Sequence, residues 1–492
     1  MNSFSDILRP GASVYFVGIK GTGVCALAEL MHSMGIKTAG SDTNEVFYTD
    51  EILKELGIPF YETFDPAHIT DDIELVIHSP AYSEDSNPEL AEARAPERRR
   101  KPIPLISYPD ALGAYSAAFD STGVTGVHGK TTTTAMCGCL IQALGLPAQV
   151  LVGSAVANFN GRSTLALGNK YFVAETCEYR KNFLAFHPKR IILTAVESDH
   201  QDFFPTYESI RDAFIEYCRL IPPGGELIYC ADDPGAAEVA CAIKSEGRGI
   251  ALVPYGFTAS GNYRIGSYRV ENDRALFSID AFPGELSLRV PGRHQALNAA
   301  AAFVLASILV KKEFGGWNES LQLAAKKALD EFKSSKRRSE IIGEAGGIIF
   351  MDDYGHHPTA IKTTLEGLSN FYPARRLVVS FMSHTYTRTA ALLDDFAESL
   401  AAADVLFLHK IYASAREHFT GNTSGKTIYE KVQSLKKNGG ELYYVDEPLD
   451  AVKPLTEILK PGDLFLTLGA GNNWPLGVEL FNHYRSNSGD VL

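Results

Sequence analysis

The chain has 492 residues with a formal net charge of −13, and 45% of its residues are hydrophobic and 21% charged. This length exceeds what one hydrophobic core normally holds, so we expect two or three globular domains. The acidic balance argues against broad nucleic-acid binding, and no uninterrupted apolar run reaches the roughly 20 residues that a membrane helix needs. The opening residues MNSFSD lack a basic region followed by an apolar one, so we expect no secretory signal.

Seven cysteines lie in the first half of the chain, several of them in apolar surroundings, namely Cys139, Cys218, Cys230 and Cys241. Their spacings fit neither a disulfide framework nor a zinc site, so we predict reduced thiols in the core. Together with the missing signal, the cysteine pattern predicts a cytoplasmic protein. The net charge and the lack of a long apolar run predict that it binds neither nucleic acid nor a membrane.

The first domain is predicted over residues 1–118. A buried strand over 13–18 leads into the glycine turn GIKGTG (18–23), a helix over 24–34 and a second strand over 36–40. Strand, glycine turn, helix and strand begin a doubly wound nucleotide-binding unit. The turn departs from the dinucleotide pattern G-x-G-x-x-G, so it predicts a diphosphate at a helix N-terminus without naming the nucleotide.

A central domain is predicted over residues 119–333, around the segment GVTGVHGKTTTT (123–134). A short strand enters a tight glycine turn, after which Lys130 and four threonines open an apolar helix. Such a loop cradles a nucleotide triphosphate: backbone N–H groups face the phosphates, the lysine reaches the β/γ oxygens and a threonine holds Mg²⁺. The alternative, an ordinary glycine-rich turn, is disfavoured because a lysine and four threonines have no packing role there. The predicted loop residues are Gly126, Val127, His128, Gly129, Lys130, Thr131 and Thr132.

Polar residues follow two neighbouring strands of the central domain. Glu175 ends a strand predicted over 171–175, and the Asp-His pair containing His200 follows one predicted over 190–195. Ligands bind at the carboxyl ends of parallel strands, so Thr131, Glu175 and His200 are predicted to hold Mg²⁺. Taken alone, Glu175 or the Asp-His pair would be interpreted as ordinary polar residues of a loop.

Further along, antiparallel alternation is predicted over 262–290 and an alanine-rich helix over 294–310. His294 and Asn298 at the start of this helix offer an imidazole and an amide suited to adenine. A helix cap would explain these two residues equally well.

A polar basic linker, SSKRR (334–338), is predicted to open a third unit over residues 334–492. Three of its strands end in ionisable clusters: DDYGHHP (352–358), SHTYTR (383–388) and the segment from Lys410. All three follow strands, so they converge on one rim, where cationic and carboxylate groups would receive a zwitterion. The paired histidines point different ways in an extended segment and lack a third ligand at standard spacing, which disfavours zinc.

The alternation of strands and helices predicts an α/β protein of three domains. We expect an N-terminal Rossmann-like domain, a central P-loop ATPase-like parallel sheet and a C-terminal Rossmann-like domain.

Taken together, these motifs resemble those of the Mur ligases of bacterial cell-wall synthesis over nearly the full chain. The resemblance rests on GIKGTG (18–23), GVHGKTT (126–132), DH (199–200), PGRH (291–294), DDYGHHP (352–358), HTYTRT (384–389) and GAG (469–471). The most specific pair is DDYGHHP with HTYTRT. This pair favours the branch that adds L-alanine over those that add glutamate, diaminopimelate or a dipeptide.

The resemblance implies an ATP-dependent carbon–nitrogen ligase of peptidoglycan precursor synthesis. Its three domains would hold a UDP sugar, ATP and the amino acid, respectively. ATP would phosphorylate the lactyl carboxylate of UDP-N-acetylmuramic acid to an acyl phosphate, which the amine of L-alanine would then attack. We expect ATP and Mg²⁺ as cofactors, only small molecules as substrates, and a monomer or homodimer.

The resemblance also implies roles for individual residues. The expected catalytic residues are Lys130, Glu175, His200, His357 and Arg388. Besides the phosphate loop, ATP is expected to contact His294, Asn298, Arg338 and Asp353. The other substrates are expected at Gly18, Gly21, Gly23, Ser41, Asp42, Ser79, Tyr354 and His384. The chain departs from the family pattern at Cys177, Tyr179, Arg180 and Ala195, where the muramate arm should bind.

Three alternatives remain beside this hypothesis. A recycling ligase would attach a preformed tripeptide to the same sugar nucleotide, but the compact C-terminal motifs disfavour it. A dinucleotide-dependent oxidoreductase built on the first glycine turn would leave the phosphate loop unexplained. A non-catalytic nucleotide-binding regulator is disfavoured because Lys130, Glu175 and His200 are all present.

Overall fold

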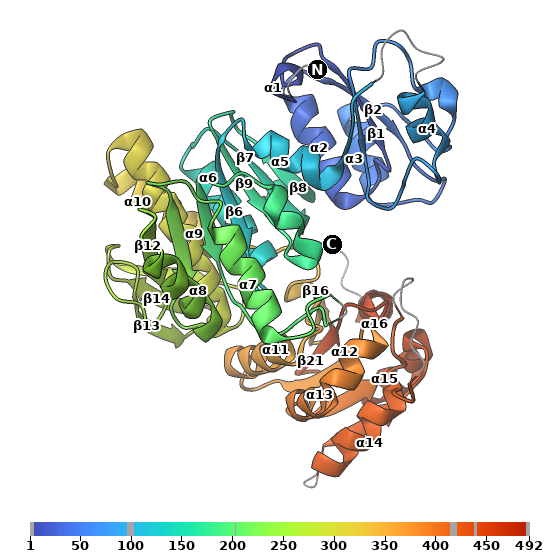
Figure 1. The fold of residues 1–492 in the computed structure, drawn as a ribbon. Helices are drawn as coiled ribbons and strands as arrows, with labels where there is room; N and C mark the ends of the chain where they lie inside the picture. The colour runs from blue at the N-terminus through green and yellow to red at the C-terminus, as the bar shows by residue number, and fades with distance from the viewer. Residues whose placement is uncertain (1–3, 96–102, 202, 414–420, 437–439, 489–492) are drawn as a thin grey trace. The chain divides into compact units, whose positions relative to one another are not determined.

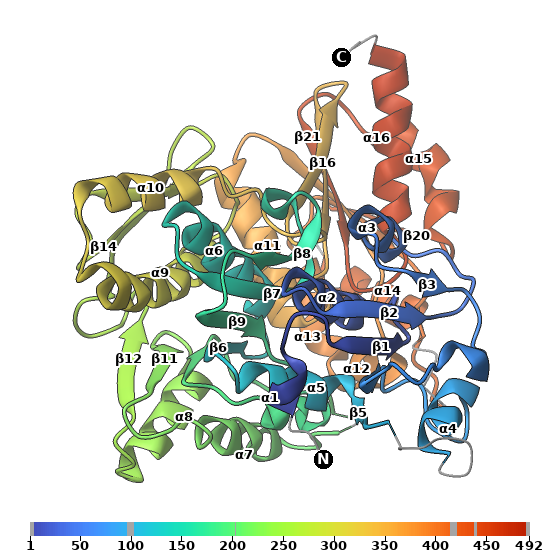
Figure 2. The same ribbon diagram turned by 90° about the horizontal axis from the view of Figure 1, so that it is seen from above.

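The computed structural model describes residues 4–95, 103–201, 203–413, 421–436 and 440–488 (Figures 1 and 2). It divides into two compact units. Unit 1 comprises residues 1–197, 208–264 and 298–328, and unit 2 comprises residues 198–207, 265–297 and 329–492. The three-domain boundaries predicted at 118 and 333 stay predictions.

The first sheet of unit 1 is parallel, with the strand order β3-β2-β1-β4-β5. Its strands are β1 (Ser13–Val17), β2 (Lys37–Ser41), β3 (Phe60–Tyr61), β4 (Leu75–His78) and β5 (Leu105–Ser107). Its helices are α1 (Phe4–Ile7), α2 (Thr22–Ser33), α3 (Thr49–Leu56), α4 (Pro88–Arg94) and α5 (Tyr108–Ser116), with a short 3₁₀ turn η1 (Pro66–His68). The strand order reverses direction between β1 and β4, which is the ligand-binding switch point of a Rossmann-like sheet. The glycine turn follows β1 directly and therefore lies at this point.

The second sheet of unit 1 has the order β12-β11-β10-β6-β9-β7-β8 and is parallel except for the β7–β8 pair. Its strands are β6 (Asp120–Thr125), β7 (Ala148–Val156), β8 (Arg162–Ala166), β9 (Tyr171–Glu175), β10 (Arg190–Leu193), β11 (Glu226–Cys230) and β12 (Ala251–Tyr255). Its helices are α6 (Lys130–Ala143), α7 (Tyr207–Cys218), α8 (Pro234–Ser245), α9 (Arg293–Phe314) and α10 (Glu319–Asp330), with 3₁₀ turns η2 (Ala157–Phe159) and η3 (Tyr179–Ala185). Because β6 lies between β9 and β10, the strands that precede Glu175 and His200 are not neighbours, so that prediction is wrong. The phosphate loop and Glu175 follow adjacent strands instead, β6 and β9.

Unit 2 contains a three-stranded antiparallel sheet, β13 (Ile265–Val270), β14 (Ala275–Ile279) and β15 (Glu285–Leu288). The alternation predicted over 262–290 is confirmed. The residues that face inward alternate along β14, where Ala275, Phe277 and Ile279 are buried.

The second sheet of unit 2 has the order β16-β17-β21-β18-β19-β20 and is parallel except for β16. Its strands are β16 (Glu340–Ala345), β17 (Ile348–Asp353), β18 (Arg376–Phe381), β19 (Val405–Leu408), β20 (Glu441–Tyr444) and β21 (Asp463–Leu468). Its helices are α11 (Pro358–Phe371), α12 (Tyr386–Ala391), α13 (Leu393–Leu400), α14 (Gly425–Leu435), α15 (Val452–Ile458) and α16 (Trp474–Ser488), with a 3₁₀ turn η4 (Pro448–Ala451).

Helices cover both faces of this sheet, because successive strand residues point to opposite sides. Ile349 and Met351 of β17 face a core formed with α11, α13 and α14. Ile348 and Phe350 face the opposite core, formed with α15 and α16, which Figure 2 shows side by side. The predicted C-terminal Rossmann-like layering is therefore confirmed.

The segment predicted as a polar basic linker is a packed part of unit 2, so that prediction is wrong. Ser334 and Ser335 are buried, and Ser334, Arg337 and Ser339 adopt left-handed backbone conformations. Long-range hydrogen bonds hold this turn, including one from the Tyr354 N–H to the Arg337 carbonyl at 2.7 Å.

The cysteines are all free, as predicted, but only five of the seven are buried. Cys241 is exposed, so its placement in the core is wrong: it lies on the outer face of α8. Within the described ranges, every helix is too short or too polar to cross a bilayer.

Candidate active site

The phosphate loop joins the end of β6 to the start of α6, and two glycines shape it. Gly126 and Gly129 have φ values of 132° and 79°, a region that other residues rarely adopt. A Cβ atom on Gly126 would lie 2.2 Å from Thr194 Oγ1, and one on Gly129 would lie 2.6 Å from Asn298 Oδ1. Conformation and close approach therefore both require glycine. No described side chain caps α6, so its first N–H groups are available to an anion.

The predicted loop lysine is held by a carboxylate that the sequence analysis did not single out. Lys130 Nζ lies 2.9 and 3.0 Å from the two carboxylate oxygens of Glu178 and also donates to the Gly126 carbonyl. Burial alone lowers the pKa of Lys130, but the nearby carboxylates, Glu178 foremost, outweigh it and raise the pKa above its usual value. Lys130 is therefore a cation at neutral pH.

Two of the predicted magnesium ligands touch each other in unit 1. The Thr131 hydroxyl donates to Glu175 Oε1 at 3.1 Å, while Glu175 Oε2 accepts a hydrogen bond from the Gly153 N–H at 2.8 Å. The carboxylate is thus fixed at the carboxyl end of β9, beside the first turn of α6. The third predicted ligand, His200, belongs to unit 2, where its ring lies 3.7 Å from the Asp199 carboxylate. The three-residue set stays a prediction.

Other loop residues are anchored by the end of β10. The Val127 N–H donates to the Ala195 carbonyl at 2.9 Å, and the Thr194 hydroxyl donates to the carbonyl of Thr125 at 3.0 Å and to that of His128. The His128 ring pairs with Glu197. These contacts fix the loop against the strand that neighbours β6.

The two residues predicted for adenine lie at different places on α9. Asn298 Oδ1 accepts a hydrogen bond from the Thr133 hydroxyl at 3.3 Å, so this amide lies against the start of α6. The His294 ring lies over Gly292, where a Cβ atom would be 2.4 Å from the ring. Both assignments to ATP, and that of the buried Thr132, stay predictions.

The first glycine turn gathers several of the residues predicted for the sugar nucleotide. Gly18 has a φ of 82°, and a Cβ atom there would lie 2.8 Å from Ser79 Cβ. The Lys20 N–H donates to Asp42 Oδ2 at 2.8 Å, which brings the end of β2 to the turn. Gly21 precedes the first residue of α2 and leaves that helix start without a side-chain cap.

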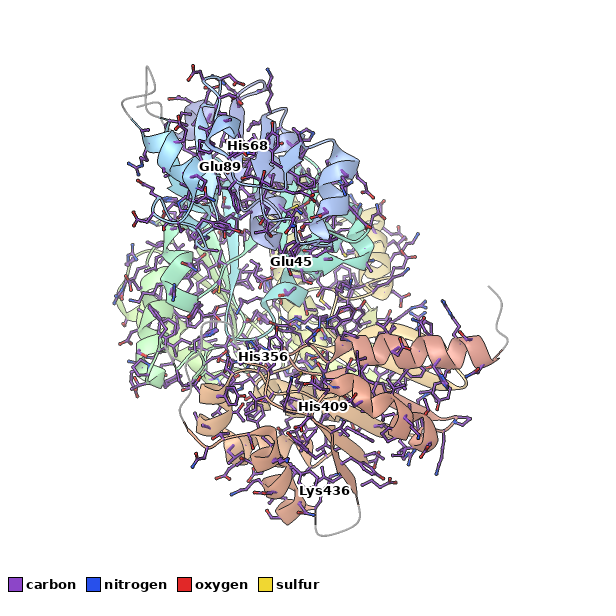
Figure 3. The ribbon with its side chains drawn as sticks, turned by 90° about the vertical axis from the view of Figure 1, so that its right-hand side faces the viewer. Glu45, His68, Glu89, His356, His409 and Lys436 are labelled. Atoms are coloured by element: carbon purple, nitrogen blue, oxygen red, sulfur yellow. The ribbon has the colours of Figure 1, made fainter. Side chains whose placement is uncertain are left out.

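Ser41 is fully buried, and its hydroxyl already has a partner. It donates to Glu89, a wholly buried carboxylate that also accepts hydrogen bonds from Tyr15 Oη at 3.1 Å and from the Asp65 N–H at 3.3 Å. His68 Nδ1 lies 2.7 Å from the same carboxylate, and Figure 3 labels this pair. The sequence analysis missed Glu89, because its partners come from distant segments. The network fixes the strand end that carries Ser41 and Asp42.

Lys20, inside the same turn, was also missed. Its side chain is fully buried, and Nζ lies 3.1 Å from Asp50 Oδ2 and 3.0 Å from the Glu45 carbonyl, a residue labelled in Figure 3. This lysine therefore ties the glycine turn to the segment that follows β2.

In unit 2, Asp353 is held rigidly at the end of β17. Its Oδ2 accepts hydrogen bonds from the Ser339 N–H at 2.6 Å and the Ser339 hydroxyl at 3.1 Å, and its Oδ1 accepts one from the Gly355 N–H at 2.7 Å. The Arg338 guanidinium lies 5.0 Å from the centre of the Tyr354 ring. The structure thus brings these predicted residues together around the turn at 334–339.

Arg388 makes a buried ion pair in unit 2. Its Nε and Nη2 donate to Asp199 Oδ1 at 3.2 and 2.8 Å. Burial raises the pKa of Asp199, but Arg388, the neighbouring His200 and His356 and the His200 N–H together outweigh it and hold that pKa well below its usual range. Burial, and then Arg388, lower the pKa of His356 far below its ordinary value, so this imidazole (labelled in Figure 3) is neutral.

Two further predicted histidines border this cluster. His357 is buried and immediately precedes α11. The His384 ring stacks on Tyr412 with 5.9 Å between ring centres, and the two residues also pair through their backbones. The roles predicted for His357, His384 and Arg388 stay predictions.

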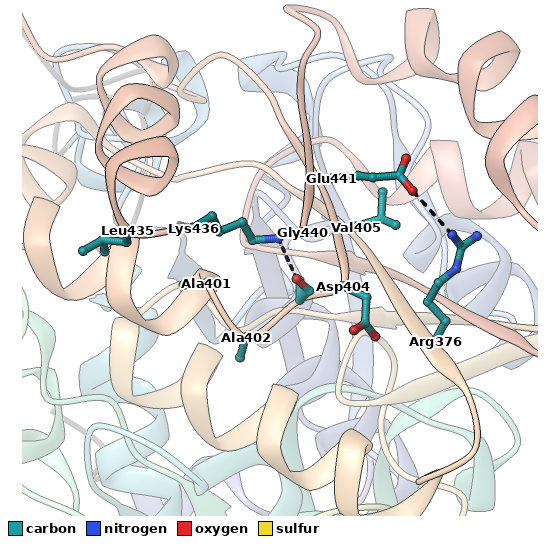
Figure 4. A pocket seen from close by; sticks show the side chains of 10 residues that line it. Arg376, Ala401, Ala402, Asp404, Val405, Leu435, Lys436, Gly440 and Glu441 are labelled. Atoms are coloured by element: carbon teal, nitrogen blue, oxygen red, sulfur yellow. Dashed lines mark hydrogen bonds and ion pairs between the residues drawn. The ribbon is translucent and has the colours of Figure 1, made fainter. Parts of the chain in front are cut away.

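A pocket of about 550 Å³ lies at the other end of the six-stranded sheet of unit 2, away from the carboxyl ends of its strands (Figure 4). It is lined by residues at the amino ends of β18, β19 and β20, including Arg376, Asp404 and Glu441. Lys436 Nζ donates to the Ala403 carbonyl there at 2.7 Å. Parallel sheets bind ligands at the carboxyl ends of their strands, so this pocket is not the predicted active site.

A phosphate loop with its lysine, a carboxylate on the adjacent strand end and additional Rossmann-like sheets define a multidomain enzyme that uses a nucleotide triphosphate. Three family models match the chain: "Mur ligase family, catalytic domain" over 13–120, "Mur ligase middle domain" over 124–306 and "Mur ligase, glutamate ligase domain" over 337–471. The chain belongs to the Mur ligase family and is an enzyme of the ligase class.

Curated relatives align over nearly the whole chain. A UDP-N-acetylmuramate–L-alanine ligase from Treponema pallidum is 48% identical, with 96% of this chain and 97% of the relative covered. One of the same name from Borreliella burgdorferi is 38% identical, with 94% and 97% covered.

Solved structures share the fold. The crystal structure of a UDP-N-acetylmuramate–alanine ligase from Thermotoga maritima matches with a TM-score of 0.73 at 26% identity, covering 96% of this chain and 99% of that one. A murein peptide ligase from Psychrobacter arcticus matches with a TM-score of 0.62 at 23% identity, covering 98% and 100%, and this likeness concerns the fold alone.

Proposed function

We propose that this chain joins L-alanine to the lactyl carboxylate of UDP-N-acetylmuramic acid, with ATP as the energy source, in peptidoglycan precursor synthesis. The observation that carries the proposal is the 48% identity to a ligase of that name over 96% of the chain. The contacts of Lys130 with Glu178 and of Thr131 with Glu175 support the proposal, because phosphoryl transfer needs a cation and oxygen ligands beside the phosphate loop. Since ATP and nucleotide sugars are metabolites of the cytoplasm, we place the reaction there.

The residues present suit a magnesium ion. The Thr131 hydroxyl and the Glu175 carboxylate, 3.1 Å apart, are the hard oxygen donors that Mg²⁺ prefers, and His200 is the third candidate ligand. When bound, the ion supplies positive charge that neutralises phosphate oxygens. We infer that Thr131 and Glu175 hold it.

The chain's own groups account for the rest of the phosphoryl-transfer site. The N–H groups at the start of α6 and the Lys130 ammonium face the triphosphate. The lactyl carboxylate oxygen forms a bond to the γ-phosphorus while the bond to the bridging oxygen breaks, and ADP leaves. To reach the β/γ oxygens, Lys130 exchanges its partner Glu178 for phosphate, so the ammonium stays paired throughout.

The second step forms the amide. The neutral amine of L-alanine attacks the acyl phosphate carbonyl, and collapse of the tetrahedral intermediate expels phosphate while the nitrogen loses a proton. We assign Arg388, His384 and Tyr354 to the amino-acid pocket and Arg338 and Asp353 to the nucleotide. Arg388 then exchanges Asp199 for the carboxylate of L-alanine, which keeps the guanidinium paired.

The test incubates the protein with ATP, Mg²⁺, UDP-N-acetylmuramic acid and either L-alanine or a murein tripeptide. We expect ADP, phosphate and a product whose mass equals the sugar nucleotide plus alanine minus water. Product formation with the tripeptide alone would overturn the proposal. Lys130→Ala should reduce phosphate release by at least about a hundredfold, since it removes a charge that stabilises the transition state. Lys312→Ala, on the exposed face of α9, is the matched control and should leave the rate unchanged.

A further inference from the structure

Tyr108, the first residue of α5, lies directly on the first glycine turn. A Cβ atom on Gly23 would be 2.7 Å from both Cζ and Oη of this tyrosine. Gly23 belongs to the first turn of α2, whose N–H groups face the expected diphosphate. The phenol therefore borders the diphosphate site, and the absence of a side chain at Gly23 is what lets the ring approach.

The other end of α5 is seated firmly on the central sheet of unit 1. A Cβ atom on Gly113 would lie 2.1 Å from the Ala185 carbonyl oxygen, at the end of η3. The Ser116 hydroxyl accepts a hydrogen bond from the His187 N–H at 2.9 Å, and the Tyr115 hydroxyl pairs with Gln149. Since η3 follows β9 closely in the chain, α5 fixes Tyr108 relative to the strand end that carries Glu175.

The Tyr108 hydroxyl has no hydrogen-bond partner among the described residues, although the ring is half-buried. Burial, followed by the charges of Glu175 and Cys177, raises the pKa of Tyr108 well above its usual value. The phenol therefore keeps its proton at any physiological pH and acts as a hydrogen-bond donor. Because this hydroxyl lies at the glycine turn and has no described protein partner, it can donate to an oxygen of a ligand bound there.

The proposed acceptor has to span this position. Its diphosphate lies at the first glycine turn, and its reacting carboxylate has to reach Lys130 and Glu175. We propose that Tyr108 is a specificity-determining residue that donates a hydrogen bond to an oxygen of the amino sugar or of its lactyl group. The assignment rests on the proposed function, because it takes the identity of the acceptor from there.

The decisive variant is Tyr108→Phe, which keeps the ring on Gly23 and removes only the hydroxyl. We expect the KM for UDP-N-acetylmuramic acid to rise about fivefold to tenfold, the usual effect of losing one neutral hydrogen bond. The KM values for ATP and L-alanine and the unfolding midpoint should not change. Tyr171→Phe is the matched control, because its hydroxyl pairs with Glu313 at the far end of β9, and it should leave all three KM values unchanged.

Direct binding separates the two candidate oxygens. UDP-N-acetylglucosamine carries the sugar but lacks the lactyl group, so calorimetry on both sugar nucleotides and on UDP with wild type and Tyr108→Phe locates the contact. Weaker binding of both nucleotides with unchanged affinity for UDP places it on the sugar, and weaker binding of UDP-N-acetylmuramic acid alone places it on the lactyl group. Weaker binding of UDP as well would place it on the diphosphate and overturn the inference. Unchanged affinity for both sugar nucleotides, or an equal rise in all three KM values, would overturn the inference. Wild type that binds the sugar nucleotide normally but never ligates L-alanine would overturn the proposed function and leave the contact standing.

Discussion

Arg337 links three segments of unit 2, and its removal is a sharp test of how the C-terminal site is held. Nε donates to Asp352 Oδ2 at 2.9 Å, and Nη2 donates to the carbonyls of Gly469 and Gly471 at 2.8 and 3.3 Å. The guanidinium also lies 5.1 Å from the centre of the Tyr354 ring. Arg337→Ala therefore removes three donors and a cation from one turn.

The size of the effect follows from the burial of Asp352, which is 3% exposed. Removing one partner of a buried ion pair costs about 3–5 kcal/mol, and we expect the lower end because Asp352 also accepts from the Thr467 hydroxyl at 2.6 Å. Burial raises the pKa of Asp352 and Arg337 opposes that shift, so the variant raises the pKa further. The native state of the variant then binds a proton more readily than the unfolded chain. The deficit of about 3 kcal/mol should consequently shrink as the pH falls.

Calorimetric melting of the full chain is the assay. At roughly 2–4 °C per kcal/mol for a domain of this size, the transition of unit 2 should fall by about 6–12 °C at neutral pH. Arg337→Lys keeps the positive charge but loses the planar set of N–H donors, so its melting temperature should lie between those of Arg337→Ala and wild type. The double variant with Asp352→Asn should recover part of the loss. A change of less than about 2 °C, or no recovery in the double variant, would refute this account.

Two further predictions concern a buried histidine and the phosphate loop. His409 (Figure 3) is buried between the Ser380 hydroxyl and the Val445 carbonyl, each at 2.8 Å, and burial lowers its pKa from 6.5 to about 4. Between pH 6.5 and about 4 the unfolded chain binds a proton at His409 that the native protein does not. The free energy of unfolding should therefore fall with decreasing pH, by up to about 3 kcal/mol. Urea unfolding should show a flatter pH dependence for His409→Asn than for wild type. Gly129→Ala should raise the KM for ATP at least about tenfold and destabilise by about 1–2 kcal/mol, because the new Cβ meets Asn298 in a left-handed turn. Gly145→Ala is the control, because Gly145 also has a positive φ, 63°, but has open space around it. In parallel melting and kinetic assays this variant should lose stability without a change in the KM for ATP. An equal rise in KM for both variants would contradict the role given to the contact between Gly129 and Asn298.

Several strands and the phosphate loop could be predicted from the sequence, because they depend on residues close together in the chain. β4, β9 and β19 begin and end where short runs of β-branched and aromatic residues predict them, because a buried strand of a parallel sheet is apolar along its whole length. The phosphate loop is equally local, since its glycines, lysine and threonines lie within a few residues of one another. The antiparallel pair β7–β8 was not predicted, because the apolar run in β7 fits a strand or a buried helix equally well and β8 opens with Arg162, Ser163 and Thr164.

The fold determines which charged side chains pair with one another. Lys130 pairs with Glu178, Arg388 with Asp199 and Glu89 with four donors, and each of these sets joins segments that are far apart in the chain. The same holds for the segment at 334–339, whose polar and basic composition predicts a linker but whose serines are buried and whose Arg337 is hydrogen-bonded. Most strands, the glycine turns and the kind of nucleotide chemistry can be predicted from the amino-acid order alone, because each depends on neighbouring residues. The partners of buried ions depend on which strand ends the fold brings together, and a local sequence pattern cannot predict contacts between distant segments.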